Sequence, residues 1–187
     1  GFARTGQAFF GFARHGIVPD MITMGKPMGN GIPISGLAAK EDVLAAFSDK
    51  LPYFNTFGGN PVSIAAAQAV LKYIKDENLQ EHCKKAGAAL LKALKEVQER
   101  HPESVGDVRG AGLFLGFEFV KNDGNKTSDK DMALNVIEML RDEHILTSVI
   151  GHYGNILKLR PPMVFSENDI DWFATSLDKC ITKLENK

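Results

Sequence analysis

Short apolar runs enclosed by glycine and proline alternate in this chain with long segments of helical periodicity, and this alternation restricts the fold more than any other feature. The apolar runs "MITM" and "ISGLAA" are typical of buried strands, and "GLFLGFEFV", "HILTSVI" and "NILKLR" are further strands. One long segment instead repeats its apolar residues at helical spacing, at Leu79, Cys83, Ala86, Leu90, Leu94 and Val97. The mixture predicts an α/β or α+β fold without internal repeats.

Further helices are expected from their periodicity and their capping residues. A short helix is predicted over residues 7–15, a brief one over "EDVLAAF", and a long one whose apolar face carries Val62, Ala65, Ala69, Val70, Tyr73 and Ile74. Ser128 and Asp131 resemble a capping box for a helix that ends near Arg141. Ser166 and Asp169 cap the last helix, which buries Ile170, Phe173, Leu177, Ile181 and Leu184.

Two domains are predicted from a shift in composition near Asp76–Leu79, one over residues 1–78 and one over 79–187. In the second, the turn "RGAG" is expected to lead into the strand "GLFLGFEFV".

Composition excludes several classes of function. The 187 residues are 44% hydrophobic and carry a formal net charge of -1, so nothing points to nucleic acid or to an anionic membrane surface. No apolar run reaches the roughly 18 residues that a membrane-spanning helix needs. Cys83 and Cys180 lie far apart in helical patterns, which predicts free buried thiols in a cytoplasmic protein. No metal site is expected.

The stretch "DMITMGKPMGNG" places one lysine, Lys26, in a glycine-rich turn between two expected strands. Lys26 is either a surface residue or a desolvated amine that attacks carbonyl groups. Glycines beside it allow a ligand to approach the backbone closely. A phosphate-binding loop is excluded, because such a loop has its glycines before the lysine and a Ser or Thr after it, whereas Pro27 follows here.

Two other stretches suit anions. In "NTFGGNP", the Thr56 hydroxyl and the N–H groups at a helix start are arranged to hold a phosphate, although the stretch also suits an ordinary capping loop. In "LKLRPPM", Arg160 ends a strand that Pro161 and Pro162 stiffen, so it can bind a carboxylate with two parallel hydrogen bonds. A salt bridge at the strand end is the alternative.

Five motifs in this order and at this spacing resemble the C-terminal half of the class III aminotransferases, which are fold-type I pyridoxal-phosphate enzymes. They are "GFARTG", "GIVPDMITMGKPMGNGIP", "NTFGGNP", "GDVRGAGLFLGFEF" and "LKLRPPM". The resemblance covers essentially the whole chain, and it is strongest to the branch with alanine–glyoxylate aminotransferases and phosphoethanolamine phospho-lyases. It implies the end of the large cofactor domain followed by an α/β small domain.

The resemblance assigns roles to individual residues. Lys26 matches the lysine that binds pyridoxal 5'-phosphate as an internal aldimine and then moves the substrate proton. Thr56 matches the threonine that contacts the cofactor phosphate from the neighbouring subunit, which implies a homodimer with shared active sites. Gly58, Gly59 and Asn60 would shape the phosphate loop, and Arg160 matches the arginine that binds the substrate carboxylate. The expected reaction moves an amino group from an amino acid or amine to a 2-oxo acid.

Some parts of the family's site lie upstream of the residues that match this chain. They include the aspartate that pairs with the pyridinium nitrogen and the aromatic residue that stacks on the cofactor ring. Asp20 is not a substitute, because it lies in the turn before the lysine strand. We therefore expect the chain to be incomplete for activity by itself. Two alternatives remain open: a phospho-lyase on the same scaffold, and a non-catalytic fragment.

Overall fold

A computed structural model describes residues 1–186 of the chain, which form two units according to their internal contacts. The first unit contains Gly1–Ala3 and Ala8–Gln80, and the second contains Arg4–Gln7 and, of the described residues, 81–186. The short segment Arg4–Gln7 therefore packs with residues that follow it by more than seventy positions. The predicted domain division between residues 78 and 79 placed this segment in the first domain. That division into domains stays a prediction.

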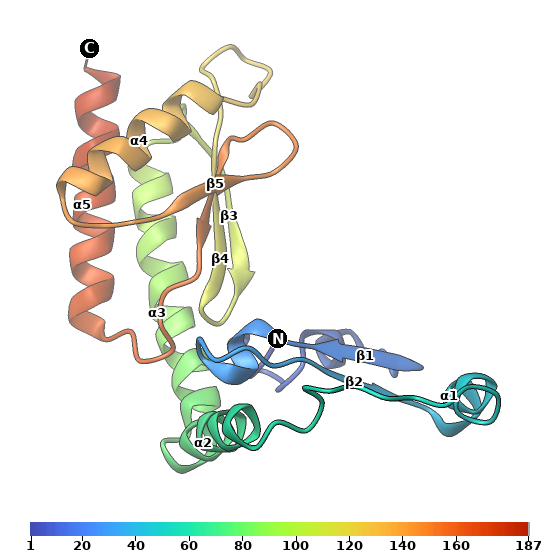
Figure 1. Cartoon of the computed structure of the whole chain (residues 1–187). Helices are drawn as coiled ribbons and strands as arrows, with labels where there is room; N and C mark the ends of the chain where they lie inside the picture. Colours follow the sequence, from blue (N-terminus) through green and yellow to red (C-terminus); the bar gives the residue numbers. More distant parts are fainter. Residues whose placement is uncertain (187) are drawn as a thin grey trace. The chain divides into compact units, whose positions relative to one another are not determined.

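The first unit is built around a two-stranded antiparallel sheet. Strands β1 (Met21–Met24) and β2 (Gly36–Ala39) pair from Met21–Ala39 to Met24–Gly36. A 3-10 turn, η2 (Lys26–Gly29), lies in their connection, and another, η1 (Gly11–His15), precedes β1. Helices α1 (Glu41–Ser48) and α2 (Pro61–Asp76) follow (Figure 1). The predicted helix over residues 7–15 is thus only a short 3-10 turn at its end.

Little of the first unit is buried, which corrects two expectations. The pattern of β1 and β2 was expected to belong to buried strands, yet no described residue of either strand is buried. In α2, Ile74 is buried whereas Val62 and Tyr73 are 70% and 54% exposed. A run of apolar residues predicts that its side chains will be covered, but it does not identify the residues that cover them.

The second unit is a four-stranded antiparallel sheet with helices on one face. The strand order is β3 (Val105–Ala111), β4 (Phe114–Phe119), β6 (Ile156–Leu159) and β5 (Ser148–Ile150). Helices α3 (Leu79–Arg100), α4 (Lys130–Asp142) and α5 (Glu167–Glu185) gather on the same face of this sheet (Figure 1). Along β6, Leu157 and Leu159 are buried under the helices, and Lys158 alternates with them.

One core holds the second unit together, and it confirms the helical periodicity of the sequence. Cys83, Ala86, Leu90, Leu94 and Val97 of α3 are all buried in it. They contact Phe117 and Phe119 of β4, together with residues of α4 and α5. The side chains expected to be buried on α5 are buried as well, except that Leu184 is only partly covered.

Local signals predicted some element ends and missed others. Ser166 and Asp169 form the expected capping box of α5. Helix α4 is capped by Asp129, whose side chain accepts the Met132 N–H, and not by Ser128 as expected. The stretch that includes "RGA" is not a turn but part of β3, and the turn follows at Gly112.

Two further features concern the cysteines and the lengths of the helices. Cys83 and Cys180 are free and buried, as predicted, and burial raises the pKa of each thiol above its ordinary value. In the part of the chain that the structure describes, none of the helices is both long and apolar enough to cross a membrane.

Candidate functional site

Lys26 occupies a strained position at the start of η2, between β1 and β2. Its φ angle is 43°, which is left-handed and uncommon for a residue with a side chain. Because Pro27 follows, the ordinary helical conformation is disfavoured at Lys26. Such strain costs on the order of 1–3 kcal/mol and is concentrated at functional sites. The Lys26 side chain is exposed and forms no ion pair with any residue that the structure describes.

Lys26 and the residues beside it line an open cavity of about 1100 Å³ in the first unit. Two of the predicted cofactor-binding residues, Gly58 and Asn60, line it together with Lys26. The rest of the lining is neutral: Pro27, Met28, Asn30, Gly31, Ile32, Pro33, Ile34, Ser35, Asn55, Phe57, Gly59, Ser63 and Ile64. Lys26 is thus the one charged group among the described residues that line the cavity. A pocket with a single cation and no acid suits an anionic ligand.

The turn at residues 55–60 is fixed by its own asparagines. Asn55 Oδ1 accepts the N–H groups of Phe57 and Gly58 at 3.1 and 3.0 Å. Asn60 Oδ1 accepts the N–H groups of Val62 and Ser63 at 3.0 and 3.2 Å, which caps α2. This corrects part of the phosphate hypothesis, because the first N–H groups of the helix are already bonded.

The remaining donors of this turn belong to Thr56 and Gly59. Within residues 1–186, neither backbone N–H of this pair donates to another residue, and the Thr56 hydroxyl has no partner. Gly59 has a φ of 74°, with open space where a side chain would be. Thr56 is exposed and is not among the residues that line the Lys26 cavity. The turn therefore presents Asn60 to the cavity and leaves the hydroxyl of Thr56 outside it.

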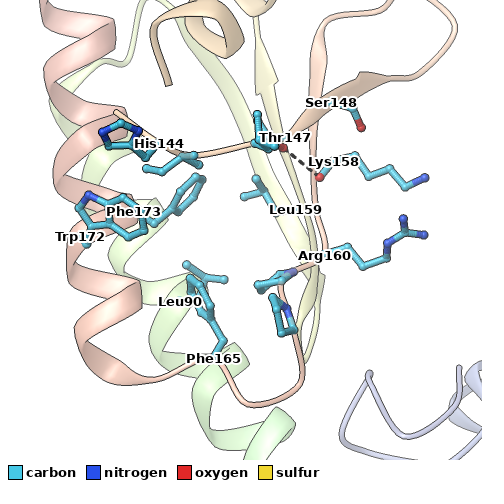
Figure 2. A pocket seen from close by; sticks show the side chains of 14 residues that line it. Leu90, His144, Thr147, Ser148, Lys158, Leu159, Arg160, Phe165, Trp172 and Phe173 are labelled. Carbon is cyan, nitrogen blue, oxygen red and sulfur yellow. Dashed lines mark hydrogen bonds between the residues drawn. The ribbon is translucent and has the colours of Figure 1, made fainter. Parts of the chain in front are cut away.

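Arg160 belongs to the second unit, where it follows the last residue of β6. It contributes to a cavity of about 490 Å³ beside Leu90, Phe165, Trp172 and Phe173. Figure 2 shows that the side chains of Arg160 and Lys158 point away from these apolar residues, whereas Leu159 points toward them. Thr147 Oγ1 donates to the Lys158 carbonyl at 3.2 Å and so fixes the strand behind Arg160. No carboxylate of the described residues pairs with the Arg160 guanidinium.

Sequence reasoning missed Arg4, the arginine of "GFARTG". Its Nη1 donates to the carbonyl of Pro161, the residue directly after Arg160, and to the Leu113 carbonyl at 3.5 Å. The motif contributes only to the family resemblance, and no local pattern connects residues 157 positions apart.

The residues present fit pyridoxal 5'-phosphate, which carries an aldehyde and a phosphate. Lys26 offers an amine to the aldehyde. The Thr56 hydroxyl and the free N–H groups of Thr56 and Gly59 are neutral donors of the kind that phosphate accepts. The described lining of the Lys26 cavity contains no acid that would repel a phosphate.

Comparison with known proteins gives consistent matches. The family model for class-III aminotransferases matches residues 1–181. An ethanolamine-phosphate phospho-lyase homolog of Caenorhabditis elegans is 43% identical over 97% of this chain and 39% of its own length. An alanine–glyoxylate aminotransferase 2 homolog of Arabidopsis thaliana, described as mitochondrial, is 38% identical over 98% of this chain and 38% of its own length.

A solved phospholyase from Arthrobacter, in complex with phosphoethanolamine, superposes with a TM-score of 0.93 at 37% identity. The match covers 97% of this chain and 43% of that one. This chain therefore spans about two fifths of the length of the relatives it matches. Because the family model covers nearly all of its residues, the chain belongs to the class-III aminotransferases, whose cofactor is pyridoxal 5'-phosphate.

Proposed function

We propose that this chain provides the cofactor-binding lysine and the substrate-binding arginine of a transaminase that moves an amino group from an amino acid or amine to a 2-oxo acid. The observation that carries the proposal is the strained Lys26, the single charged group among the described lining of its cavity, next to Gly58 and Asn60. The term "complete enzyme" here means this chain together with the part of the fold that its relatives contain and that this chain does not span.

Each residue has a separate task in the proposed reaction. Bound pyridoxal phosphate supplies an electron sink that stabilises negative charge on the substrate α carbon. Lys26 would hold the cofactor, and its Nζ would then move the proton from the substrate α carbon to the cofactor carbon C4′. Arg160 binds the substrate carboxylate with two parallel hydrogen bonds. Gly58, Gly59 and Asn60 shape the turn that holds the phosphate.

Lys26 needs a neutral amine for these tasks, and burial favours the neutral form of a lysine. Its side chain is exposed among the described residues. The proposal therefore requires that the rest of the complete enzyme cover Lys26. Large apolar side chains that the first unit exposes, such as those of Val18 and Phe54, would be buried by such a cover.

The position of Thr56 supports a homodimer with shared active sites. Thr56 lies outside the Lys26 cavity of its own chain, and the same stretch exposes Tyr53, Phe54 and Phe57 by 72%, 87% and 81%. Aromatic side chains are enriched in subunit interfaces. The Thr56 hydroxyl would then reach the cofactor phosphate of the second subunit.

Replacing Thr56 by alanine is expected to raise the dissociation constant of the cofactor by at least about 10-fold, because one hydrogen bond to a charged acceptor contributes about 1.5 kcal/mol or more. Equilibrium dialysis of the complete enzyme measures the effect. Thr175→Ala, at an exposed threonine of α5, is the control and leaves the affinity unchanged.

Hybrid dimers test where Thr56 acts. Subunits with Thr56→Ala are mixed with subunits with Lys26→Ala, at a cofactor concentration that saturates only the wild type. A shared site predicts that each hybrid holds one site with both lesions and one intact site, so activity rises toward half of the wild-type value. If activity stays at the level of the separate variants, Thr56 serves its own subunit and the shared site is refuted.

A phospho-lyase is the second candidate function. The observations that favour it are the 43% identity to a phospho-lyase homolog and the TM-score of 0.93 to a phospholyase. In that reaction the same lysine removes the same proton, but the substrate then loses phosphate from the neighbouring carbon and no amino group is transferred to a 2-oxo acid.

Product analysis of the complete enzyme separates the candidates. Amine transfer that depends on an added 2-oxo acid, without release of inorganic phosphate, is expected for the transaminase. Phosphate release from phosphoethanolamine without any 2-oxo acid would establish the lyase instead. If neither product forms in the presence of the cofactor, both catalytic proposals fail and the non-catalytic alternative is favoured.

The proposed cytoplasmic location is supported by the two free thiols.

A further inference from the structure

The segment Arg4–Gln7 is held tightly between α3 and the turn that joins β3 to β4. The Leu113 N–H donates to the Arg4 carbonyl at 3.0 Å. A side chain on Gly112, which has a φ of 51°, would lie 2.4 Å from that carbonyl oxygen. A side chain on Gly6 would lie 2.6 Å from the Cα atom of Lys84. The backbone of Arg4 is therefore fixed within the second unit by contacts that only glycines permit.

From this fixed backbone, the Arg4 guanidinium reaches the exit of β6. Its Nη1 donates to the carbonyl of Pro161 and, more weakly, to that of Leu113 at 3.5 Å. Pro161 and Pro162 have no N–H group, so the sheet cannot hold this part of the chain. No other residue in the described part of the chain donates to the Pro161 carbonyl. The Arg4 side chain is thus the hydrogen-bond donor that holds the carbonyl of Pro161, the residue that follows Arg160.

The positive charges of Arg4 and Arg160 are not balanced by ion pairs within the described residues. Burial lowers the pKa of Arg4 from its ordinary value, Cys83 partly offsets this effect, and the charge of Arg160 lowers it further. Arg4 Nη1 contacts the carbonyl of Pro161, the residue next to Arg160, so the two positive charges oppose each other. No carboxylate in residues 1–186 forms an ion pair with either of them. An anion bound at Arg160 would relieve this repulsion.

We propose that Arg4 is the positioning residue for substrate carboxylate binding: it fixes Pro161 so that the guanidinium of Arg160 is presented in one orientation, and it adds positive charge behind Arg160. This inference rests on the proposed function, because it assigns the carboxylate to Arg160. Arg4 touches neither substrate nor cofactor, and it acts through the strand exit. The backbone contact with Leu113 remains in any side-chain variant, so the segment keeps its place when Arg4 is substituted.

Arg4→Lys and Arg4→Met in the complete enzyme test the inference. Each is expected to raise KM for substrates with a carboxylate about 10-fold, with kcat and cofactor affinity changed less than about 2-fold. Amines without a carboxylate keep their KM. Arg109→Met is the control, since Arg109 lies on the same sheet but pairs with Asp107 and Glu118, and it leaves KM unchanged.

A double substitution separates positioning from general stability. In an Arg160→Ala background, Arg4→Met is expected to add no further rise in KM, because its effect passes through Arg160. An additive rise, or an equal rise for amines without a carboxylate, would overturn the inference.

Hydrogen exchange of the complete enzyme gives a readout that does not need activity. Arg4→Met is expected to speed exchange in the segment 160–165 by about 10-fold, while the centre of β4 keeps its protection. Unchanged exchange in that segment overturns the inference. Faster exchange with an unchanged KM would mean that Arg4 is structural only, which overturns it too. If the complete enzyme transfers no amino group, the proposed function fails, whereas the exchange result still decides whether Arg4 fixes the strand exit.

Discussion

Replacing Lys26 by alanine in the complete enzyme is expected to lower turnover by roughly 10⁴-fold. Two contributions would be lost together, because in the proposed reaction the same amine both holds the cofactor and moves the substrate proton. Positioned acid–base groups alone contribute about 10² to 10⁴-fold, and covalent catalysis adds to this. Steady-state rates with a saturating amino donor and 2-oxo acid measure the loss.

The conservative variant should fail as well. Lys26→Arg keeps the positive charge, but a guanidinium stays protonated and cannot bind the cofactor aldehyde. Lys40→Ala is a matched control, because Lys40 follows β2 in the same unit and forms an exposed ion pair with Asp20 at 2.6 Å. Such pairs contribute little, so Lys40→Ala should retain wild-type turnover. Appreciable turnover in Lys26→Arg would contradict the assignment.

Replacing Arg160 by alanine is expected to raise KM for carboxylate substrates roughly 10²-fold. The physical reason is the loss of two charge-assisted hydrogen bonds, which contribute about 2 to 3 kcal/mol to binding. No internal carboxylate pairs with Arg160 among the described residues, so removal of its side chain leaves no buried acid unpaired. Kinetics with a series of amino acids and their decarboxylated amines measure the effect.

The comparison between the two kinds of substrate is decisive for Arg160. Amines without a carboxylate should lose less than about 3-fold, since they never form these hydrogen bonds. Arg141→Ala, at an exposed arginine of α4 that pairs with Glu138 and Asp142, is the control and should change neither KM. An equal loss for both kinds of substrate would mean that Arg160 is structural.

The sequence predicted those parts of the fold that depend on local periodicity. The strand "MITM" has its predicted bounds, and the buried face of α3 is correct from Cys83 to Val97. These features follow from residues close together in the chain, so a short window contains the information. The strand β3 was missed because Gly106 and Gly110 make "VGDVRGA" resemble a turn. In the structure β4 pairs along it, with an irregularity near Val105.

The candidate site was predictable only in part, for the same reason. Lys26, Gly58 and Asn60 were each identified from short motifs, and they line one cavity. The capping of Val62 and Ser63 by Asn60 was not foreseen, because a helix start alone does not reveal whether its N–H groups are already bonded. The role of Arg4 depends on a contact across 157 positions, which no motif describes.

The central claim is that Lys26 carries the cofactor, and chemical trapping tests it most directly. The complete wild-type enzyme is loaded with pyridoxal phosphate, reduced with borohydride and digested, and the modified peptide is identified by mass spectrometry. The account predicts that the reduced cofactor is attached to Lys26 and that a Lys26→Ala enzyme yields no modified peptide. Stoichiometric attachment to any other lysine, or to none in an active enzyme, would contradict it.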